Sequence, residues 1–252
     1  MCKNISIIIQ ARIGSARLYG KVMKEICGFP VLWHVVNRIK KSNYATNIIV
    51  ATTENKEDDE VYEYCKKNNI AVFRGSSSDV LDRYYQCAKK FNCENIVRIT
   101  GDCPLHDAKV IDKVISTYLN GNYDYVANTF EYTYPDGLDA EVFSFDVLEE
   151  AWEKAKLASE REHVTPYIKK NDKLKKINVI ADKKYPIYRL TIDCPEDYKM
   201  INSVYEGIGK LDFGLDETVE FLKQYPQIVE INNCYELNEG YSKSLQKDMI
   251  IK

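Results

Sequence analysis

A basic, glycine-containing segment near the N-terminus has the composition of an anion-binding loop. Residues 10–21 (QARIGSARLYGK) include two arginines, a lysine, a serine and two glycines. Glycine lets the backbone turn and approach a ligand closely, and turned N–H groups together with basic side chains make a concave anion site. The segment follows an apolar run, residues 5–9, that predicts a buried strand. A loop at the carboxyl end of a first strand suits a nucleoside triphosphate.

The spacing of this loop differs from two common phosphate-binding patterns. GxxxxGK[ST] needs a serine or threonine after the lysine, whereas Lys21 precedes Val22, and GxGxxG is absent. A basic loop exposed to solvent, without a ligand, is the alternative for this segment taken alone. The candidate nucleotide-binding residues of the segment are Gln10, Ala11, Arg12, Gly14, Ser15, Arg17 and Lys21.

Two aspartates follow predicted strands and precede a Cys-Pro pair. Asp102 follows the predicted strand Asn95–Thr100, and Asp193 follows a predicted strand at 187–192. Mg²⁺ prefers one or two carboxylates together with phosphate oxygens and water. The sequence therefore predicts that Asp102 and Asp193 hold one or two Mg²⁺ ions against a triphosphate. Turn formation or helix capping is the alternative role for such an aspartate.

Three more polar segments are candidates for binding the rest of the substrates. The loop 74–79 (RGSSSD) offers an arginine, hydroxyls and free N–H groups to a base or sugar, or is a solvated loop. In YPDGLDAE, Asp139 and Glu141 lie two residues apart, so a strand would point both to one face. A sugar or polyol acceptor would satisfy them; an exposed polar strand is the alternative. His163 is a candidate acceptor ligand or proton carrier, or a structural histidine.

The apolar pattern predicts an α/β fold. Strands are expected at 5–9, 47–51, 70–73, 95–100 and 123–127, with helices at 31–42, 57–68, 79–91 and 107–119 between them. Ser78 is the expected N-cap of the third helix. Alternation of this kind implies a largely parallel sheet with helices on both faces and right-handed crossovers. The loops 10–21, 74–79 and 100–106 should then gather at the carboxyl ends of the strands.

The second half of the chain is less regular. Strands are expected at 138–143 and 187–192, and helices at 146–157, 161–170, 195–208 and 215–224. We expect one domain over residues 1–252, with a nucleotide-binding half at about 1–128 and an acceptor-binding half at about 129–232. The polar tail, 233–252, is expected to be poorly ordered.

Composition narrows the class of protein. A net charge of −3 gives no bulk attraction to nucleic acid or to a membrane, and 45% hydrophobic residues suffice for a large core. No apolar run approaches the roughly 20 residues that a membrane-spanning helix needs, and a signal-peptide pattern is absent. The eight cysteines form no CxxC pair, so zinc is not expected and the thiols should be reduced. These features predict a cytoplasmic protein.

Six segments, taken together and in order, resemble the cytidylyltransferases that include CMP-sialic acid and CMP-KDO synthetases. Within that family the resemblance is closest to the spore-coat polysaccharide biosynthesis proteins of the SpsF type. The segments fall within about residues 4–205 and read QARIGSARLYGKV, RGSSSDVLDRYYQCA, IVRITGDCPL, YPDGLDAEVF, REHVTPYI and RLTIDCPEDY. One departure is Tyr19, which stands where the synthetases commonly have proline.

This resemblance implies a nucleotide-diphospho-sugar transferase fold, a Rossmann-like three-layer α/β/α sandwich with a mostly parallel mixed sheet. It implies CTP with Mg²⁺, attack of an acceptor oxygen on the α-phosphorus, release of pyrophosphate, and a homodimer. By motif position the catalytic residues are Arg12, Arg17, Lys21 and Asp102, and the metal ligands are Asp102 and Asp193. Backbone near Ala11 would hold the cytosine, and the nucleoside pocket would be completed by Arg74, Ser76, Ser78, Asp79 and Thr100. The acceptor ligands would be Asp136, Asp139, Glu141, Arg161, His163 and Arg189.

Three functions compete at this point. The first is a CTP-dependent cytidylyltransferase that activates an acidic, nonulosonic-acid-like sugar for surface glycan synthesis. The second is a nucleotidyltransferase for a sugar phosphate, a polyol phosphate or a small phosphorylated acid. The third is a glycosyltransferase that uses a nucleotide sugar, although the segment Gly101–Pro104 lacks the second aspartate of a DxD motif. A binding protein without catalysis is the remaining alternative.

Overall fold

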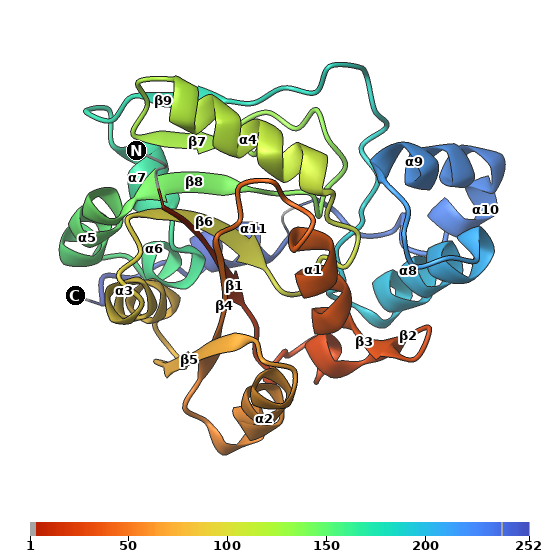
Figure 1. The fold of residues 1–252 in the computed structure, drawn as a ribbon, viewed down its shortest axis with the longest axis horizontal. Coiled ribbons are helices and arrows are strands. Elements are labelled where there is room, and N and C mark those ends of the chain that lie inside the picture. The colour runs from red at the N-terminus through yellow and green to blue at the C-terminus, as the bar shows by residue number, and fades with distance from the viewer. Residues whose placement is uncertain (1–3, 238, 252) are drawn as a thin grey trace.

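A mixed seven-stranded sheet forms the centre of the computed structural model, which describes residues 4–237 and 239–251 (Figure 1). The strand order is β5-β4-β1-β6-β8-β7-β9. The strands are β1 (Ile5–Gln10), β4 (Asn47–Thr53), β5 (Ala71–Gly75), β6 (Asn95–Thr100), β7 (Tyr125–Ala127), β8 (Glu141–Ser144) and β9 (Lys176–Asn178). A separate two-stranded ribbon consists of β2 (Glu25–Ile26) and β3 (Phe29–Pro30).

Helices surround this sheet. They are α1 (Val31–Ile39), α2 (Asp59–Lys67), α3 (Val80–Lys90), α4 (Ala108–Asn120), α5 (Phe145–Lys154), α6 (Ala158–His163), α7 (Pro166–Lys170), α8 (Pro195–Ile208), α9 (Leu215–Gln224), α10 (Pro226–Val229) and α11 (Glu239–Gln246). Short 3₁₀ turns lie at Lys21–Met23 and Lys56–Asp58. None of the helices within the described ranges has the length and apolar character needed to span a bilayer.

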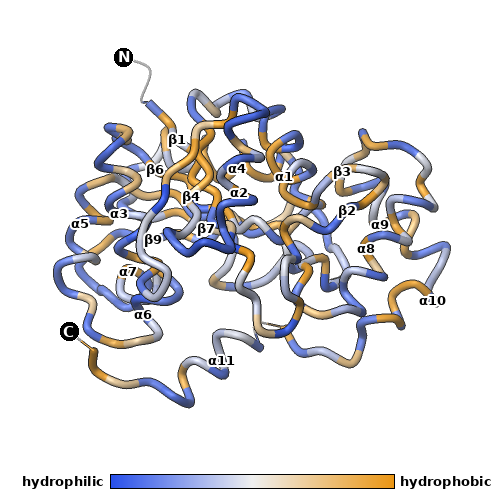
Figure 2. The backbone as a smooth tube through the Cα atoms, turned by 90° about the horizontal axis from the view of Figure 1, so that it is seen from below, coloured by the Kyte–Doolittle hydropathy of each residue, from blue (hydrophilic) through white to orange (hydrophobic). Residues whose placement is uncertain are grey.

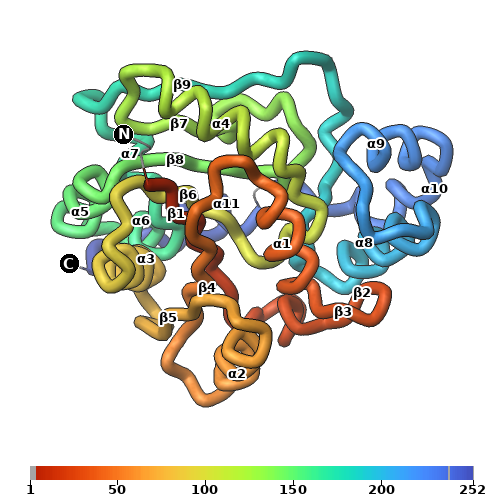
Figure 3. Tube along the Cα trace, in the orientation of Figure 1, coloured from red at the N-terminus to blue at the C-terminus, as the bar shows by residue number. Residues whose placement is uncertain are grey.

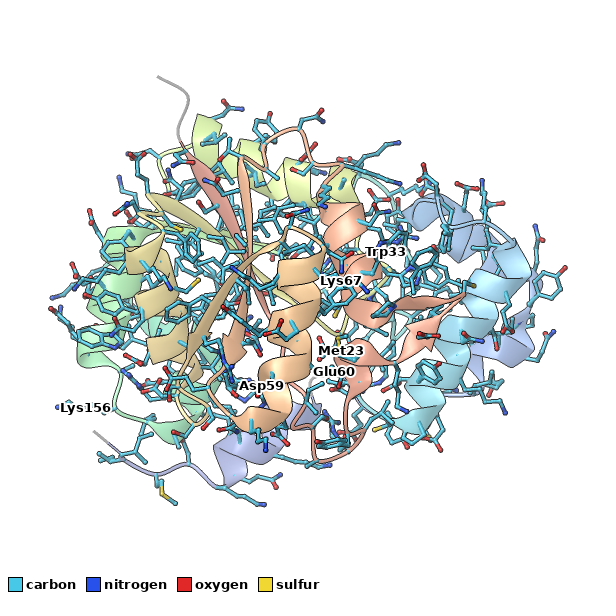
Figure 4. All side chains as sticks on the ribbon, turned by 60° about the horizontal axis from the view of Figure 1, so that its bottom comes forward. Met23, Trp33, Asp59, Glu60, Lys67 and Lys156 are labelled. Atoms are coloured by element: carbon cyan, nitrogen blue, oxygen red, sulfur yellow. The ribbon has the colours of Figure 1, made fainter. Side chains whose placement is uncertain are left out.

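The alternation of side chains along the strands produces two cores, one on each face of the sheet. Ile7 and Ile9 of β1 pack with the apolar faces of α1, α2 and α4, whereas Ile8 packs with α3, α5 and α7. The central strands β1 and β4 are among the strongly hydrophobic stretches of the chain (Figure 2). Charged residues of α2, namely Asp59, Glu60 and Lys67, stay exposed (Figure 4). The expected three-layer arrangement is confirmed.

Strand direction brings the predicted loops together. β1 is parallel to both β4 and β6, and Gln10 lies opposite Thr100 at the carboxyl ends of β1 and β6. β8 runs antiparallel to β6 and β7, so the sheet is mixed beyond β6. A third apolar cluster joins α8 and α9 to β2 and to the segment around Leu190, and these elements lie side by side at one end of the sheet (Figure 3).

The second half of the chain departs from the sequence prediction in several places. Residues 187–192 do not form a strand of the sheet; they make only an isolated bridge between Asp136 and Arg189. The reason is that their backbone groups bond to loops, since Leu190 N–H donates to Asp136 O at 2.8 Å and Ile192 N–H donates to Asp102 O at 2.9 Å. The strand β9 was not predicted.

Local chemistry explains the other differences. The predicted helix 161–170 is split into α6 and α7 because Val164 adopts a positive φ of 70° and Pro166 opens a new helix. Asp79, not Ser78, caps α3, because its carboxylate accepts the Asp82 N–H at 2.9 Å. The tail, predicted to be poorly ordered, forms α11 and packs against α6.

Candidate functional site

Two adjoining cavities open where the carboxyl ends of β1 and β6 meet. The loop cavity has a volume of about 250 Å³ and is lined mainly by the 10–21 segment. The large cavity has a volume of about 490 Å³ and is lined by residues of the 129–141 and 163–169 segments and by the first turn of α11. The residues that line both cavities are Gln10, Arg17, Thr100, Asp102, His163 and Asp193.

A buried aspartate and two glycines hold the basic loop in place. The Ile13 N–H donates to Asp58 Oδ1 at 2.6 Å, and the Gly20 N–H closes the loop onto Ile13 O at 3.0 Å. Gly20 has a φ of 68°, which favours glycine. A Cβ on Gly101 would lie 2.8 Å from the carbonyl oxygen of Gln10, so glycine allows the two loops to touch.

Lys21 lies between the two aspartates that the sequence predicts as metal ligands. Its Nζ is 2.5 Å from Asp102 Oδ2 and 2.7 Å from Asp193 Oδ1. Burial would lower the Lys21 pKa, but the two carboxylates raise it above its usual value, so the ammonium stays charged. Burial would raise the Asp102 pKa, but Lys21 lowers it to about 2. The structure therefore brings all three predicted residues together.

Asp193 is held by its neighbours rather than by a strand. The Arg189 Nη2 lies 3.2 Å from Asp193 Oδ2, and the Arg189 Nε lies 2.8 Å from Asp197 Oδ1. Asp197, in the first turn of α8, also accepts the Asp193 N–H at 3.0 Å. Arg189, a predicted acceptor ligand, lines the large cavity but is already paired with carboxylates.

The two loop arginines have different partners. Arg17 pairs with Asp193 at 3.0 Å and with Glu239 of α11 at 2.9 Å. Arg12 is exposed, lines the loop cavity and donates to the Ser77 carbonyl at 3.1 Å. Ser15 and Ala11 line the same cavity, whereas Gly14 packs against Glu57, where a Cβ would lie 2.6 Å from the carboxylate.

Asp136 and Asp139 bring two weakly compensated carboxyl groups into the large cavity. Burial, together with the nearby Asp136 and Glu141 carboxylates, raises the pKa of Asp139 to about 7. Burial likewise raises the pKa of Asp136 to about 6, against the opposing effect of Arg189, which lies 3.8 Å away. The Tyr132 hydroxyl donates to Asp139 Oδ2 at 3.4 Å. These carboxyl groups suit hydroxyl donors on a ligand.

Glu141, the third acid of this predicted group, is occupied by partners from the protein itself. It is only 2% exposed, and its carboxylate accepts hydrogen bonds from Arg98 at 2.5 Å and from Thr165 at 2.8 Å. Lys169 pairs with it at 2.9 Å, and the Tyr125 hydroxyl also donates to it. Burial would raise its pKa, but these partners hold the pKa well below its usual range. Asp139 and Glu141 both line the large cavity, although Asp139 precedes β8 and does not lie on one strand face with Glu141 as predicted.

The predicted nucleoside loop and Arg161 do not line either cavity. Arg74 is occupied by Asp59 and by backbone carbonyls of β4 and the following turn. Arg161 is 4% exposed and donates to Asp79 through Nε at 2.8 Å and to the Trp152 carbonyl at 2.7 Å. The pair of Arg161 and Asp79 therefore ties α6 to the start of α3.

The two predicted serines of this loop are also outside the cavities. Ser76 Oγ accepts the Asp79 N–H at 3.0 Å and so shapes the loop. Ser78 lies among neither set of lining residues.

A sequence model of the cytidylyltransferase family matches residues 6–232. The chain belongs to this family. It is 33% identical over 232 residues to the spore coat polysaccharide biosynthesis protein SpsF of Bacillus subtilis, covering 88% of this chain and 95% of that protein. A solved structure of a cytidylyltransferase from Leptospira borgpetersenii superposes with a TM-score of 0.87 at 36% identity, covering 92% and 99% of the two chains. A 3-deoxy-manno-octulosonate cytidylyltransferase of Hydrogenovibrio crunogenus is 33% identical over 123 residues, about half of each chain.

Several residues of this enzyme's cavities were missed from the sequence. Arg83 of α3 lines the loop cavity and is buried, and its Nε has no hydrogen-bond partner among the described residues. Its place one turn after Asp79 could have signalled it. Arg98, Lys169 and Tyr241 line the large cavity. Arg98 was missed because it lies within the strand β6, and Tyr241 because it lies in the tail, beyond the end of the family match at residue 232.

The donor set at Asp102 and Asp193 fits a Mg²⁺ ion that also binds phosphate. Both carboxylates lie within hydrogen-bond distance of one cation, the Lys21 ammonium, and both face the loop cavity. No group of three or more His, Cys, Asp or Glu side chains is arranged to hold a metal within residues 4–237 and 239–251. Two carboxylates leave positions for phosphate oxygens and water, which Mg²⁺ prefers.

Proposed function

We propose that this cytidylyltransferase uses CTP and Mg²⁺ to activate a small acidic, nonulosonic-acid-like sugar as its CMP derivative, with release of pyrophosphate, for surface glycan synthesis. The observation that carries the proposal is that the two cavities adjoin. The residues that line both, which we call the shared wall, are Gln10, Arg17, Thr100, Asp102, His163 and Asp193. Basic residues of the 10–21 loop face one side of it and the carboxyl groups Asp136 and Asp139 face the other. A phosphate donor and a hydroxyl-bearing acceptor would meet at this wall.

The basic residues would act by charge and position. Arg12, Arg17 and Lys21 offer three cations to a triphosphate within one cavity, and they would neutralise the leaving β- and γ-phosphates. Lys21 is now paired with Asp102 and Asp193, so it would exchange these carboxylates for phosphate oxygens when the nucleotide binds. Mg²⁺ bound by the two aspartates would supply further neutralisation of phosphate charge.

The lining of the large cavity favours an acceptor with many hydroxyls and few charges. Asp136 and Asp139 can accept hydrogen bonds from sugar hydroxyls. Among the predicted partners for a sugar carboxylate, Arg189 is already paired, whereas His163 lines the cavity. Lys169, which the sequence did not predict, also lines it and retains 31% exposure of its side chain. A phosphorylated acceptor would bring a second negative charge to a wall already rich in carboxyl groups, so the acidic sugar is favoured.

The names of two relatives agree with this proposal. One acts on 3-deoxy-manno-octulosonate, an acidic sugar, and one serves spore coat polysaccharide biosynthesis. We further infer a cytoplasmic location, on the sequence features given above, and a homodimer, on the family resemblance. Size-exclusion chromatography with light scattering tests the dimer.

Calorimetry with CTP, UTP, ATP and GTP, with and without Mg²⁺, tests the nucleotide. We expect tight binding of CTP alone, dependent on Mg²⁺. Pyrophosphate release is then measured with 3-deoxy-manno-octulosonate and N-acetylneuraminate as acidic sugars, against phosphorylated sugars and polyols. Preference for another nucleotide, or release of pyrophosphate only with phosphorylated acceptors, would overturn the proposal.

A further inference from the structure

The C-terminal helix α11 closes one side of the active site with polar contacts. The chain reaches it from the side of α8 and crosses toward α6 (Figures 1 and 2). Its first residues, Glu239, Gly240 and Tyr241, line the large cavity. The described part of α11 has no buried residue, so no apolar core holds it against the body of the enzyme. It also lies beyond residue 232, where the family match ends.

The two ends of this segment are attached differently. Beyond α11, Asp248 accepts both the Ser159 N–H at 3.0 Å and the Ser159 hydroxyl at 2.7 Å. The Ile251 N–H donates to Lys156 O at 2.9 Å. At the start of α11, by contrast, the Arg17–Glu239 ion pair joins the helix to the basic loop. The C-terminal end is therefore anchored to the start of α6. Before α11, the chain is held where Arg189 Nη1 donates to Glu236 O at 3.1 Å and the Tyr235 hydroxyl donates to Glu196 Oε2 at 2.8 Å. The first turn of α11 itself is joined to the basic loop through Arg17, a proposed triphosphate ligand.

Arg17 cannot serve Glu239 and a triphosphate equally. Its guanidinium lines both cavities and is divided between Asp193 and Glu239. A triphosphate carries several negative charges and presents oxygens with the fork geometry that suits arginine, so it outcompetes a single carboxylate. Glu239 would keep a partner after the exchange, because Lys243 one turn later lies 2.8 Å from its other oxygen. Release therefore leaves no unpaired carboxylate.

The same helix holds His163 at the shared wall. Ser244 Oγ lies 2.9 Å from His163 Nε2, and the Tyr241 ring stands edge-on to the imidazole with centroids 5.0 Å apart. Movement of α11 would therefore change the large cavity and the shared wall together.

We propose that α11 is a latch: Glu239 occupies Arg17 in the nucleotide-free enzyme, and the triphosphate takes Arg17 from it and frees the start of the helix. The latch rests on the proposed triphosphate site. The latch predicts that CTP binds before the acceptor, because α11, which lines the acceptor cavity, can move only after Arg17 has exchanged Glu239 for the triphosphate.

Calorimetry of CTP with Mg²⁺ on the full-length enzyme tests the latch through Glu239→Gln. Removing the competing charge should tighten CTP binding about two- to fivefold, the scale of one partly exposed ion pair. Glu220→Gln on α9 makes the same change in net charge at an exposed position away from the cavities and should leave the affinity unchanged. Unchanged or weaker binding in Glu239→Gln would overturn the proposal.

Hydrogen exchange gives an independent readout in the wild-type enzyme. Amides 239–246 should exchange faster when CTP is bound, while amides of β1 and β6 do not. Slower exchange in 239–246 would mean that nucleotide closes the helix, and it would overturn the latch. If wild type binds no nucleotide at all, the proposed function fails first, and the two failures are thereby distinguished.

Discussion

Replacing Glu141 with glutamine tests whether this acid stabilises the fold or binds the acceptor. The amide removes the negative charge and turns one acceptor oxygen into a donor that faces other donors. Lys169 can turn to solvent, since 31% of its side chain is exposed, but Arg98 is 14% exposed and would lose its ionic partner inside the protein. Leaving a buried charge unpaired costs about 3–5 kcal/mol. Because water can solvate Lys169 but not Arg98, we expect Glu141→Gln to lower the free energy of unfolding by about 3 kcal/mol.

Urea and thermal unfolding at pH 7 measure this loss. For a chain of this length, about 3 kcal/mol corresponds to a fall in Tm of roughly 6–12 °C. Glu153→Gln, at an exposed position on α5, is the matched control and should change stability by less than about 0.5 kcal/mol. If Glu141→Gln has the same unfolding free energy and Tm as the control but loses turnover, Glu141 acts on the acceptor and the structural role is refuted.

The pH dependence of the same variant has a defined sign. The folded-state pKa of Glu141 is depressed, so its contribution is complete above the unfolded carboxyl pKa of about 4.3 and is lost as the pH falls below that value. The difference in unfolding free energy between wild type and Glu141→Gln should therefore be constant from pH 8 to pH 5 and shrink in more acidic solution. A constant difference down to pH 3 would contradict this origin.

Three further outcomes are expected. Asp102→Asn should lower kcat at least about 10²-fold in a pyrophosphate-release assay, because it removes one electrostatic partner at the shared wall; near-wild-type turnover would remove Asp102 from the site. Asp139 has a folded-state pKa raised to about 7, so its ionisation costs stability as the pH rises from about 4 to about 7. Urea unfolding should accordingly show Asp139→Asn gaining stability over wild type across that range, and a gain independent of pH would contradict the shift. Arg161→Gln should lower stability by about 1–3 kcal/mol through loss of its pair with the partly exposed Asp79, while calorimetric CTP affinity stays within twofold of wild type; a large affinity loss would return Arg161 to the substrate site.

The main strands and helices of the first half could be predicted because they are encoded locally, whereas the short ribbon of β2 and β3 was not predicted. β1 shows its burial in an apolar run interrupted only by Ser6, and α4 starts after a capping aspartate, Asp107. The 187–192 segment has the same apolar character as a strand, but its hydrogen-bond partners are the loops at Asp102 and Asp136, which no local pattern reveals. The error did not affect the placement of Asp193, since either arrangement delivers it beside Asp102.

The site was predictable where residue type alone indicates chemistry. Lys21, Asp102 and Asp193 do meet at one cavity wall. Arg161 and Glu141 have residue types equally suited to binding, but the partners that occupy them, Asp79 and Arg98, lie 82 and 43 residues away in sequence. A sequence shows which side chains are charged; it does not show which charges are already satisfied by another part of the chain.

The internal pairing of Lys21, Arg17 and Asp193 has a consequence for selectivity in a crowded ionic solution. A small anion such as inorganic phosphate or chloride must break these pairs to bind Lys21 or Arg17, and it brings too few contacts to compensate for them. On the proposed function, a nucleoside triphosphate with its metal would replace the broken contacts together. The pairing would thus make Lys21 and Arg17 selective for a polyvalent ligand over abundant simple anions.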